Sequence, residues 1–447
     1  MAQAALFADD QSVGQATDER EARASRRRTD GKPRVVTADR SQIELRPYDL
    51  DGLIRQSHPA RGVWAFVEQL DLRKFYEPIK ARANEPGRAS TDPKVLLALW
   101  LYATMNGVGS ARELERLCQE HRAYQWLRGG VPVNYHTLSD FRTAHPQAFD
   151  DLLTQMLAVL MAQGLIRLRR VAQDGTRVRA SAGAGSFRRR PRLEEFLTAA
   201  RQQVEAAKQS AADPQVPARQ RAARERAARH RQERITRALQ ELEQIEAQRA
   251  AQSGGKKAKG EPRASLTDPQ ARKMKMGDGG FRPAYNVQFA ADTQSQFVVG
   301  VGITNSGSDQ GEATSMIEQV TARTGVQPAE YLVDGGFTSK DNVTDVTEMG
   351  ITLYGPVVER GDQDPHQPRA YDSHAVADWR LRMATPQAKE IYKERAATIE
   401  RVNADTKTHR SLGRFLVRGM NKALSVALLN AITFNMVHWL HVGRNIT

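Results

Sequence analysis

Two short stretches decide the fold, VAQDG at residues 171–175 and LVDGG at residues 332–336. In each, apolar residues with β-like spacing lead to an Asp that is followed by Gly. We predict that Asp174 and Asp334 each stand at the C-terminal end of a strand, where α/β sheets place their ligands. Taken alone, an Asp before Gly also suits an ordinary turn. If the two strands are neighbours, however, the carboxylates become adjacent although they lie 334 − 174 = 160 residues apart.

Adjacent carboxylates repel, and a divalent cation relieves that repulsion. Ligands that are all oxygen favour Mg²⁺ or Mn²⁺ over zinc. A third acid is expected on the long helix predicted for residues 386–405, which offers Glu390, Glu394 and Glu400. No GxGxxG or Walker-type phosphate loop occurs in the chain, so nucleotide-driven chemistry has no support.

The segments around these acids predict an α/β domain. After the strand with Asp174, the pattern predicts a helical insertion, two strands joined by a turn, and then helix, strand, helix, strand and helix. The predicted strands cover residues 285–290, 297–303, 331–333 and 351–354, and helices are predicted for 310–324 and after Ser339.

The residues before the first acid predict a helical domain at 46–166. The segment at 93–105 is apolar nearly all round, and a capping box of Ser110 and Glu113 begins the next helix after a Gly-containing turn. Helix, short turn and helix resemble a helix-turn-helix unit, from which three arginines are candidates to contact phosphates: Arg112, Arg116 and Arg142. The alternative is an ordinary solvated basic face.

The remaining segments complete the predicted organisation. We expect a flexible basic arm at 1–45, the first core strand at 167–186, an αα-hairpin insertion at 187–252 and a flexible basic linker at 253–280. The rest of the core follows at 281–412, and a helical segment at 413–447. The arginine-rich hairpin suits a solvated insertion better than a specific binding device.

Composition restricts the partners and the compartment. The 447 residues include 66 Lys and Arg against 52 Asp and Glu, a net charge of 66 − 52 = +14, which is typical of proteins that meet nucleic acid. A single cysteine, Cys118, excludes an internal disulfide and a cysteine-rich zinc site, and predicts a reducing compartment. The apolar windows at 95–105 and 423–440 are short or interrupted, so we expect buried helices without membrane spans.

The last predicted helix carries a recognisable spacing: Tyr392, two residues, Arg395, four residues, Glu400, six residues, Lys407. It resembles the signature helix of DDE-type transposases of bacterial insertion sequences, in which three residues more often separate the Arg and the Glu. The resemblance extends from about residue 58 to 439 and rests on the order of further motifs. These include Arg88 with Asp92-Pro93, Gly107 with Ser110, Tyr135 with Thr137, Thr267-Asp268-Pro269, Tyr285-Asn286-Val287-Gln288, and Phe415 with Arg418-Gly419.

The resemblance implies an RNase H-like mixed-sheet catalytic core with an α-helical N-terminal domain and a helical-hairpin insertion. It implies that Asp174, Asp334 and Glu400 are catalytic and hold two Mg²⁺ or Mn²⁺ ions. Three residues on or beside the signature helix would contact DNA: Tyr392, Arg395 and Lys407. The expected partners are double-stranded terminal inverted repeats, target DNA and further copies of this chain, in the bacterial cytoplasm at the nucleoid. The alternatives are a DNA-binding repressor without catalysis and a metal-dependent nuclease on the same core.

Overall fold

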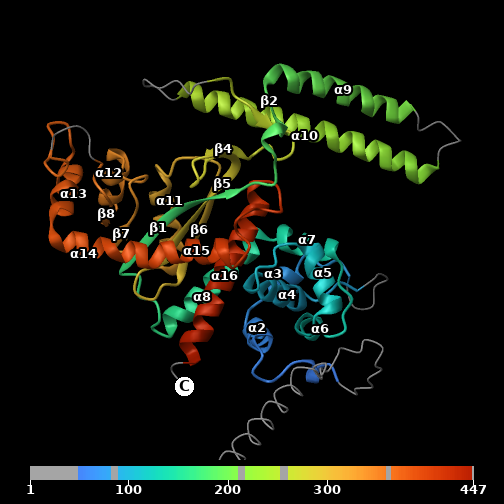
Figure 1. The fold of residues 1–447 in the computed structure, drawn as a ribbon, viewed down its shortest axis with the longest axis horizontal. Coiled ribbons are helices and arrows are strands. Elements are labelled where there is room, and N and C mark those ends of the chain that lie inside the picture. Colours follow the sequence, from blue (N-terminus) through green and yellow to red (C-terminus); the bar gives the residue numbers. More distant parts are fainter. Residues whose placement is uncertain (1–48, 82–88, 210–216, 252–259, 359–363, 445–447) are drawn as a thin grey trace, which may run out of the picture. The chain divides into compact units, whose positions relative to one another are not determined.

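The computed structural model describes residues 49–81, 89–209, 217–251, 260–358 and 364–444, so the predicted arm at 1–45 lies outside the described residues. Its centre is a mixed sheet in which the strands lie side by side in the order β6-β5-β1-β7-β8 (Figure 1). The bounds are β1 Arg170–Arg179, β5 Phe281–Asp292, β6 Val298–Thr304, β7 Glu330–Leu332 and β8 Thr352–Tyr354.

Strand direction follows from the connections. β5 pairs antiparallel with both β1 and β6, and a short turn between residues 292 and 298 joins β5 to β6. β1, β7 and β8 are parallel, because a helix intervenes before each return to the sheet. Those helices are α11 (Glu312–Thr324) and α12 (Lys340–Glu348). Together with the helices below, this arrangement is the predicted RNase H-like core.

The register of β1 and β7 brings the two acid-bearing segments level. Arg170 lies opposite Glu330, and Ala172 lies opposite Leu332, a constant offset of 330 − 170 = 160. The same offset separates Asp174 from Asp334. The expectation that the two strands are neighbours is therefore confirmed.

The expected strand ends are wrong in detail. Asp174 lies in the middle of β1, opposite Phe289 of β5, and Asp334 lies two residues beyond the end of β7. β1 continues past Asp174 because the 12-residue strand β5 pairs with it as far as Arg179. Beyond the end of β7, β1 meets Arg414, which forms an isolated parallel bridge with Arg179.

Helices cover both faces of the sheet. Side chains alternate along β1, so Asp174 and Gly175 point to opposite faces. On the Gly175 side, α11 packs against β6. On the Asp174 side lie α14 (Pro386–Arg395), a π-helical turn η4 (Ala396–Glu400) and α15 (Arg401–Thr408). α13 (His374–Ala384) packs beside α12 and β8.

The helical N-terminal part packs around α4 (Pro93–Met105), whose residues from Val95 to Thr104 are all buried. This is the predicted all-round apolar helix. The Ser110 side chain accepts a hydrogen bond from the Glu113 backbone N–H, as the capping box predicts. The other helices are α2 Pro59–Glu68, α3 Arg73–Tyr76, α5 Ala111–Glu120, α6 Arg122–Arg128, α7 Tyr135–Ala144 and α8 Pro146–Ala162, after a short 3₁₀ turn η1 at Asp51–Leu53.

The C-terminal helix α16 (Met420–Arg444) joins the helical part to the sheet, since it packs against α4, α7, α8 and β6. One continuous apolar core therefore runs from Ile54 to Met436. By length and composition, residues Met420–Val442 are the one helix in the described ranges apolar enough to cross a membrane, yet 67% of that window is buried inside the protein. That burial is typical of a core helix.

The insertion after β1 consists of α9 (Arg190–Gln209) and α10 (Ala218–Ala251), which pack against each other over a small apolar cluster of their own. A short 3₁₀ turn η2 (Ala184–Ser186) precedes it. Its base is closed by a two-stranded sheet of β2 (Phe187–Arg188) and β3 (Ala264–Ser265).

The predicted linker at 253–280 is wrong over its described part. Residues 260–280 contain β3 and β4 (Arg272–Lys275), and β4 extends the main sheet by pairing with β5. The physical reason for this order is a buried polar contact, which the pattern of neighbouring residues does not reveal. Asp268 is fully buried and accepts a hydrogen bond of 2.6 Å from the Tyr285 hydroxyl.

Candidate active site

Asp174 is the centre of the candidate site. Its side chain is only 16% exposed, and its Oδ2 atom lies 3.0 Å from Asn403 Nδ2 and 3.4 Å from a guanidinium nitrogen of Arg395. Burial raises the pKa of the Asp174 carboxyl to about 6, although Arg395 acts in the opposite direction. The negative charges of Asp334 and Asp309 also raise this pKa.

Arg395 stands between two of the predicted acids. Besides Asp174, its guanidinium lies 3.1 Å from Glu400 Oε1. The Arg395 side chain is 11% exposed, whereas Glu400 is 59% exposed. The structure therefore brings Asp174 and Glu400 to one cation, and Arg395 is engaged by carboxylates rather than left free for a phosphate.

The π-helical turn explains how Arg395 and Glu400 meet. In a continuous α-helix, residues five apart point about 140° away from each other. Between Ala396 and Glu400 the helix instead follows the i→i+5 pattern, which stacks residues five apart. The extra residue between the Arg and the Glu is thus absorbed by a π-helical turn, a feature frequent at functional sites.

Asp334 lies in the turn after β7, where its Oδ1 accepts a hydrogen bond of 2.8 Å from the Gly336 backbone N–H. A Cβ atom built on Gly336 would lie 3.0 Å from this oxygen and 3.4 Å from Oδ2 of Asp309. Both carboxylates therefore approach the same glycine, and Asp309 belongs to the neighbourhood of the site.

Sequence reasoning missed Asp309. It is 4% exposed, and its Oδ1 accepts hydrogen bonds of 2.6 Å from Asn286 and 2.7 Å from Gln288. Its Oδ2 lies 3.1 Å from the guanidinium of Arg177. The sequence did contain a signal for it. Asn286 and Gln288 lie in a strand of mainly apolar residues, and buried amide side chains need a polar partner.

Tyr392 and Lys407 are the other two residues of the signature spacing. Tyr392 is half-buried, and its pKa is raised by burial, with Arg395 opposing and the three acids adding to the rise. Lys407 is exposed as a residue, yet desolvation of its amine lowers its pKa, with Asp174 opposing. Both therefore lie beside the acids.

The alternative acids on this helix are occupied elsewhere. Glu394 forms an ion pair with Arg170 at the start of β1, and Glu390 pairs with Lys393 on the surface. The geometry thus favours Glu400 over Glu394 and Glu390 as the third acid. Lys393 is a surface partner of Glu390.

The donor set suits a hard divalent cation. The predicted acids and Asn403 all carry oxygen atoms that can bind a metal ion. The amide oxygen of Asn403 is buried and has no hydrogen-bond partner in the described part of the chain. Within the same residues, no three His, Cys, Asp or Glu side chains lie close enough to hold an ion together. Arg395 accounts for this, because its guanidinium occupies the space between Asp174 and Glu400.

The raised pKa of Asp174 predicts a pH dependence for the metal-free protein. The folded carboxyl has a pKa of about 6, above the ordinary value of about 3.9. The folded state therefore binds this proton more tightly, and the resulting stability is present below about pH 4 and lost as the pH rises through about 6. The difference of roughly two pKa units corresponds to about 3 kcal/mol.

Urea unfolding without divalent cations measures this effect in the native chain and in Asp174→Asn, which cannot titrate. Between about pH 4 and pH 7 we expect the free energy of unfolding of the variant to rise by about 2–3 kcal/mol relative to the native protein. A difference between the two proteins that stays constant over this range contradicts the prediction.

The three arginines predicted to contact phosphates in the helical part differ in placement. Arg112 is exposed, with its guanidinium 5.0 Å from the ring centre of Tyr135. Arg116 is also exposed, but it forms ion pairs with Glu113 and Glu120 on its own helix. Those pairs reduce the charge that it offers to DNA.

Arg142 corrects the prediction. It is 5% exposed, stacks 4.1 Å above the Trp100 ring and donates a hydrogen bond of 2.6 Å to the Gly109 carbonyl oxygen. Burial lowers the pKa of its guanidinium to about 10. The charge is buried because Arg142 fills the contact between α7 and the core helix α4, so it does not reach a phosphate.

This placement predicts opposite effects for two arginines. Arg142→Met should lower the free energy of unfolding by about 2 kcal/mol or more, because it removes the buried hydrogen bond and the stacking on Trp100. The matched variant Arg112→Met should leave stability within about 0.5 kcal/mol, as surface changes usually do. Chemical denaturation of both variants tests this, and equal stability contradicts the placement.

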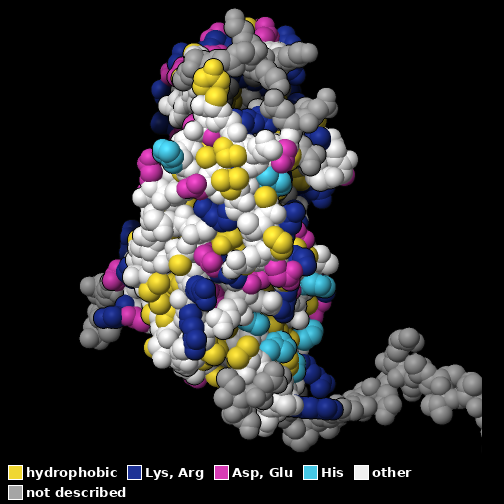
Figure 2. Space-filling view, turned by 90° about the vertical axis from the view of Figure 1, so that its left-hand side faces the viewer, with side chains coloured by type: hydrophobic (Ala, Val, Ile, Leu, Met, Phe, Trp, Pro, Cys, Tyr) yellow, Lys and Arg dark blue, Asp and Glu magenta, His cyan; other side chains and the backbone are white. Residues whose placement is uncertain are grey.

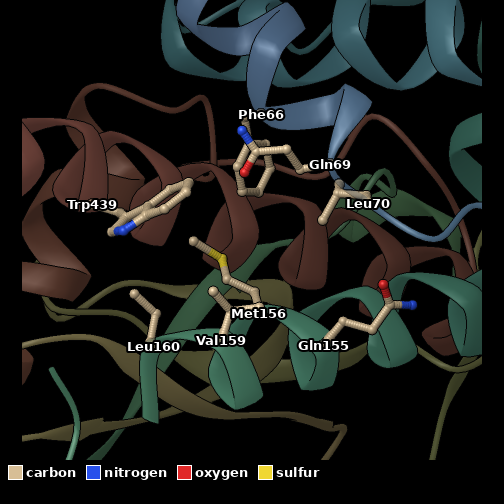
Figure 3. A pocket seen from close by; sticks show the side chains of 8 residues that line it. All are labelled: Phe66, Gln69, Leu70, Gln155, Met156, Val159, Leu160 and Trp439. Carbon is tan, nitrogen blue, oxygen red and sulfur yellow. The ribbon is translucent and has the colours of Figure 1, made fainter. Parts of the chain in front are cut away.

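A small apolar cavity lies elsewhere. It has a volume of about 60 Å³ and is enclosed by side chains of α2, α8 and α16, including Phe66, Met156 and Trp439 (Figure 3). No acidic or basic side chain lines it, so it offers no groups for acid–base or metal chemistry.

On the face of the protein that Figure 2 shows, positive side chains do not gather into one patch. The face in Figure 2 shows Lys and Arg side chains interspersed with Asp and Glu.

Two family models match the chain. The model described as "Transposase domain (DUF772)" matches residues 48–144, and the model described as "Transposase DDE domain" matches residues 248–436. The second match includes Asp309, Asp334 and Glu400 but not Asp174, which lies between the two matched regions. No curated protein and no solved structure matches the chain.

Proposed function

Because this chain belongs to the DDE-type transposases of the insertion-sequence kind, we propose that it binds terminal inverted repeats, cleaves DNA by Mg²⁺-dependent hydrolysis and joins the 3′-hydroxyl ends to target DNA. The family makes it an enzyme that cleaves and transfers DNA. Asp174 and Glu400 both pair with the guanidinium of Arg395, and this contact carries the finer proposal. Asp334 acts on the same site, because its charge raises the pKa of Asp174. We place the reaction in the bacterial cytoplasm, on nucleoid DNA.

We assign the three acids as the ligands of two divalent cations, Mg²⁺ or Mn²⁺. When bound, these ions supply Lewis acids for the attacking and leaving oxygens of a phosphodiester. Asp174 accepts a hydrogen bond from Asn403. Glu400 is exposed, so it is the acid most able to move as Arg395 gives way.

Exposed cationic side chains suit the DNA backbone. Arg179 at the end of β1 and Arg414 form a β-bridge, and both are exposed. Neither side chain forms an ion pair within the described residues, and two adjacent unpaired cations favour a phosphate between them. With Lys407 and Arg112, they form the DNA surface that we propose.

Synapsis requires two ends in one complex, so we propose a homodimer or a larger assembly on DNA. A strand-transfer assay on oligonucleotides from the cognate ends, with Mg²⁺ or with EDTA, tests the whole function. Cleaved and joined products with Mg²⁺ alone support it. Repeat-specific binding without nicking would identify a repressor, and cleavage without joining would identify a nuclease.

A further inference from the structure

Asn403 lies at the acidic site although the family assignment and the acids themselves give it no role. It follows Glu400 by three residues on α15, a spacing that puts two side chains on neighbouring positions of one helical face. Its Nδ2 donates a hydrogen bond of 3.0 Å to Oδ2 of Asp174. The contact joins residues 229 positions apart, so it links the acidic helix directly to β1.

The two ends of the Asn403 amide are used differently. The nitrogen faces a carboxylate, which only accepts hydrogen bonds, and this contact determines the orientation of the amide. The oxygen is buried and has no donor in the part of the chain that the structure describes. A buried acceptor without a partner is costly, and such an atom calls for a ligand.

The chemistry around this oxygen favours a cation. Asp174 accepts the hydrogen bond of Asn403, and Glu400 precedes Asn403 by three residues. Arg395 bridges these two acids. Neutral amide oxygens and carboxylates are the ligands that Mg²⁺ and Mn²⁺ prefer. An amide oxygen also adds a ligand without adding another charge to acids that already repel.

We propose that Asn403 is a fourth member of the metal site, which holds Asp174 through its amide nitrogen and offers its amide oxygen to the cation. The proposal rests on the metal-dependent function proposed above. Asn403 positions Asp174 and also binds the ion directly. Variants that remove both polar atoms or keep only an oxygen distinguish these two roles.

The experiment is calorimetric titration of Mn²⁺ into the full-length, DNA-free protein. Asn403→Leu keeps the size of the side chain but removes both polar atoms, and it should weaken Mn²⁺ binding by at least about tenfold, as loss of supporting contacts at metal sites does. Asn403→Asp keeps an oxygen at this position and adds a charge, so it should tighten Mn²⁺ binding.

The matched control for added charge is Ala404→Asp, one residue along the same helix with an exposed side chain. Asn403→Asp should bind Mn²⁺ at least about fivefold more tightly than Ala404→Asp, because more ligand charge raises affinity only where the oxygen reaches the ion. Asn403→Asp should also melt at a lower temperature than the native chain without Mn²⁺ and regain that loss with it.

Two results overturn the assignment of Asn403: a dissociation constant of Asn403→Leu within about twofold of the native value, or Asn403→Asp binding no better than Ala404→Asp. Asp174→Asn separates this failure from that of the proposed function. If Asp174→Asn loses Mn²⁺ binding while Asn403→Leu keeps it, only Asn403 is misassigned. If the native chain binds no Mn²⁺, the metal-dependent function itself fails.

Discussion

Asp174→Asn, Asp334→Asn and Glu400→Gln should each reduce metal-dependent strand cleavage by at least about 10³-fold. In the proposed function each of these carboxylates is a charged oxygen ligand, and the site works by electrostatic stabilisation. Each substitution keeps the size of the side chain. Binding to the terminal repeats should stay within about threefold, since none of these carboxylates attracts phosphate. Cleavage of a labelled end oligonucleotide, beside a mobility-shift titration, measures both quantities.

Glu394→Gln is the matched control. It replaces a Glu by Gln six residues before Glu400. The Glu394 carboxylate pairs with Arg170, whereas Glu400 pairs with Arg395. Its cleavage rate should stay within about threefold of the native rate, as expected for a partly exposed ion pair. Loss of cleavage in Glu394→Gln together with normal cleavage in Glu400→Gln would reverse the choice between the two acids.

Gly175→Ala should lower the free energy of unfolding by about 3 kcal/mol, the upper part of the range for overpacked sites. A Cβ atom on Gly175 would lie 2.1 Å from Oδ1 of Asp309, 2.4 Å from Nε2 of Gln288 and 2.8 Å from Oδ1 of Asn286. These side chains form a buried hydrogen-bond network, so they move only by breaking it.

The comparison for this variant is Gly183→Ala. Gly183 has a φ of −90° and no atom within 4 Å of an added Cβ, so it accepts Ala without strain. Urea denaturation at neutral pH should therefore show a large loss only for Gly175→Ala. A loss below about 0.5 kcal/mol at Gly175 would mean that Asp309 does not pack over β1 as described.

The pattern of neighbouring residues was sufficient to predict those helices and strands that depend only on a short stretch of sequence. The apolar run of α4, the capping box at Ser110 and the paired acid-bearing segments were all predicted correctly as elements. The exact position of Asp174 was not, because the length of β1 depends on β5, more than 100 residues away. The predicted linker failed because β3 and β4 form only by pairing with other strands, and Asp268 finds its partner Tyr285 only after folding.

The spacing of the signature helix shows the limit most clearly. By sequence, four residues between Arg395 and Glu400 place the two side chains on different faces of an α-helix. The π-helical turn brings them together, and the ion pairs of Arg395 with both acids accompany it. Hydrogen-bond pattern within a helix responds to such tertiary contacts, which residue spacing alone does not contain.

By itself, then, the sequence determined the class of the core, the two acids at a fixed offset and the helix that carries the third. The tertiary structure alone decided that Arg142 is buried, that Asp309 and Asn403 join the acids, and that Arg395 lies between Asp174 and Glu400. The physical reason is range. Periodicity and capping act over a few residues, whereas burial and charge pairing depend on side chains brought together from distant parts of the chain.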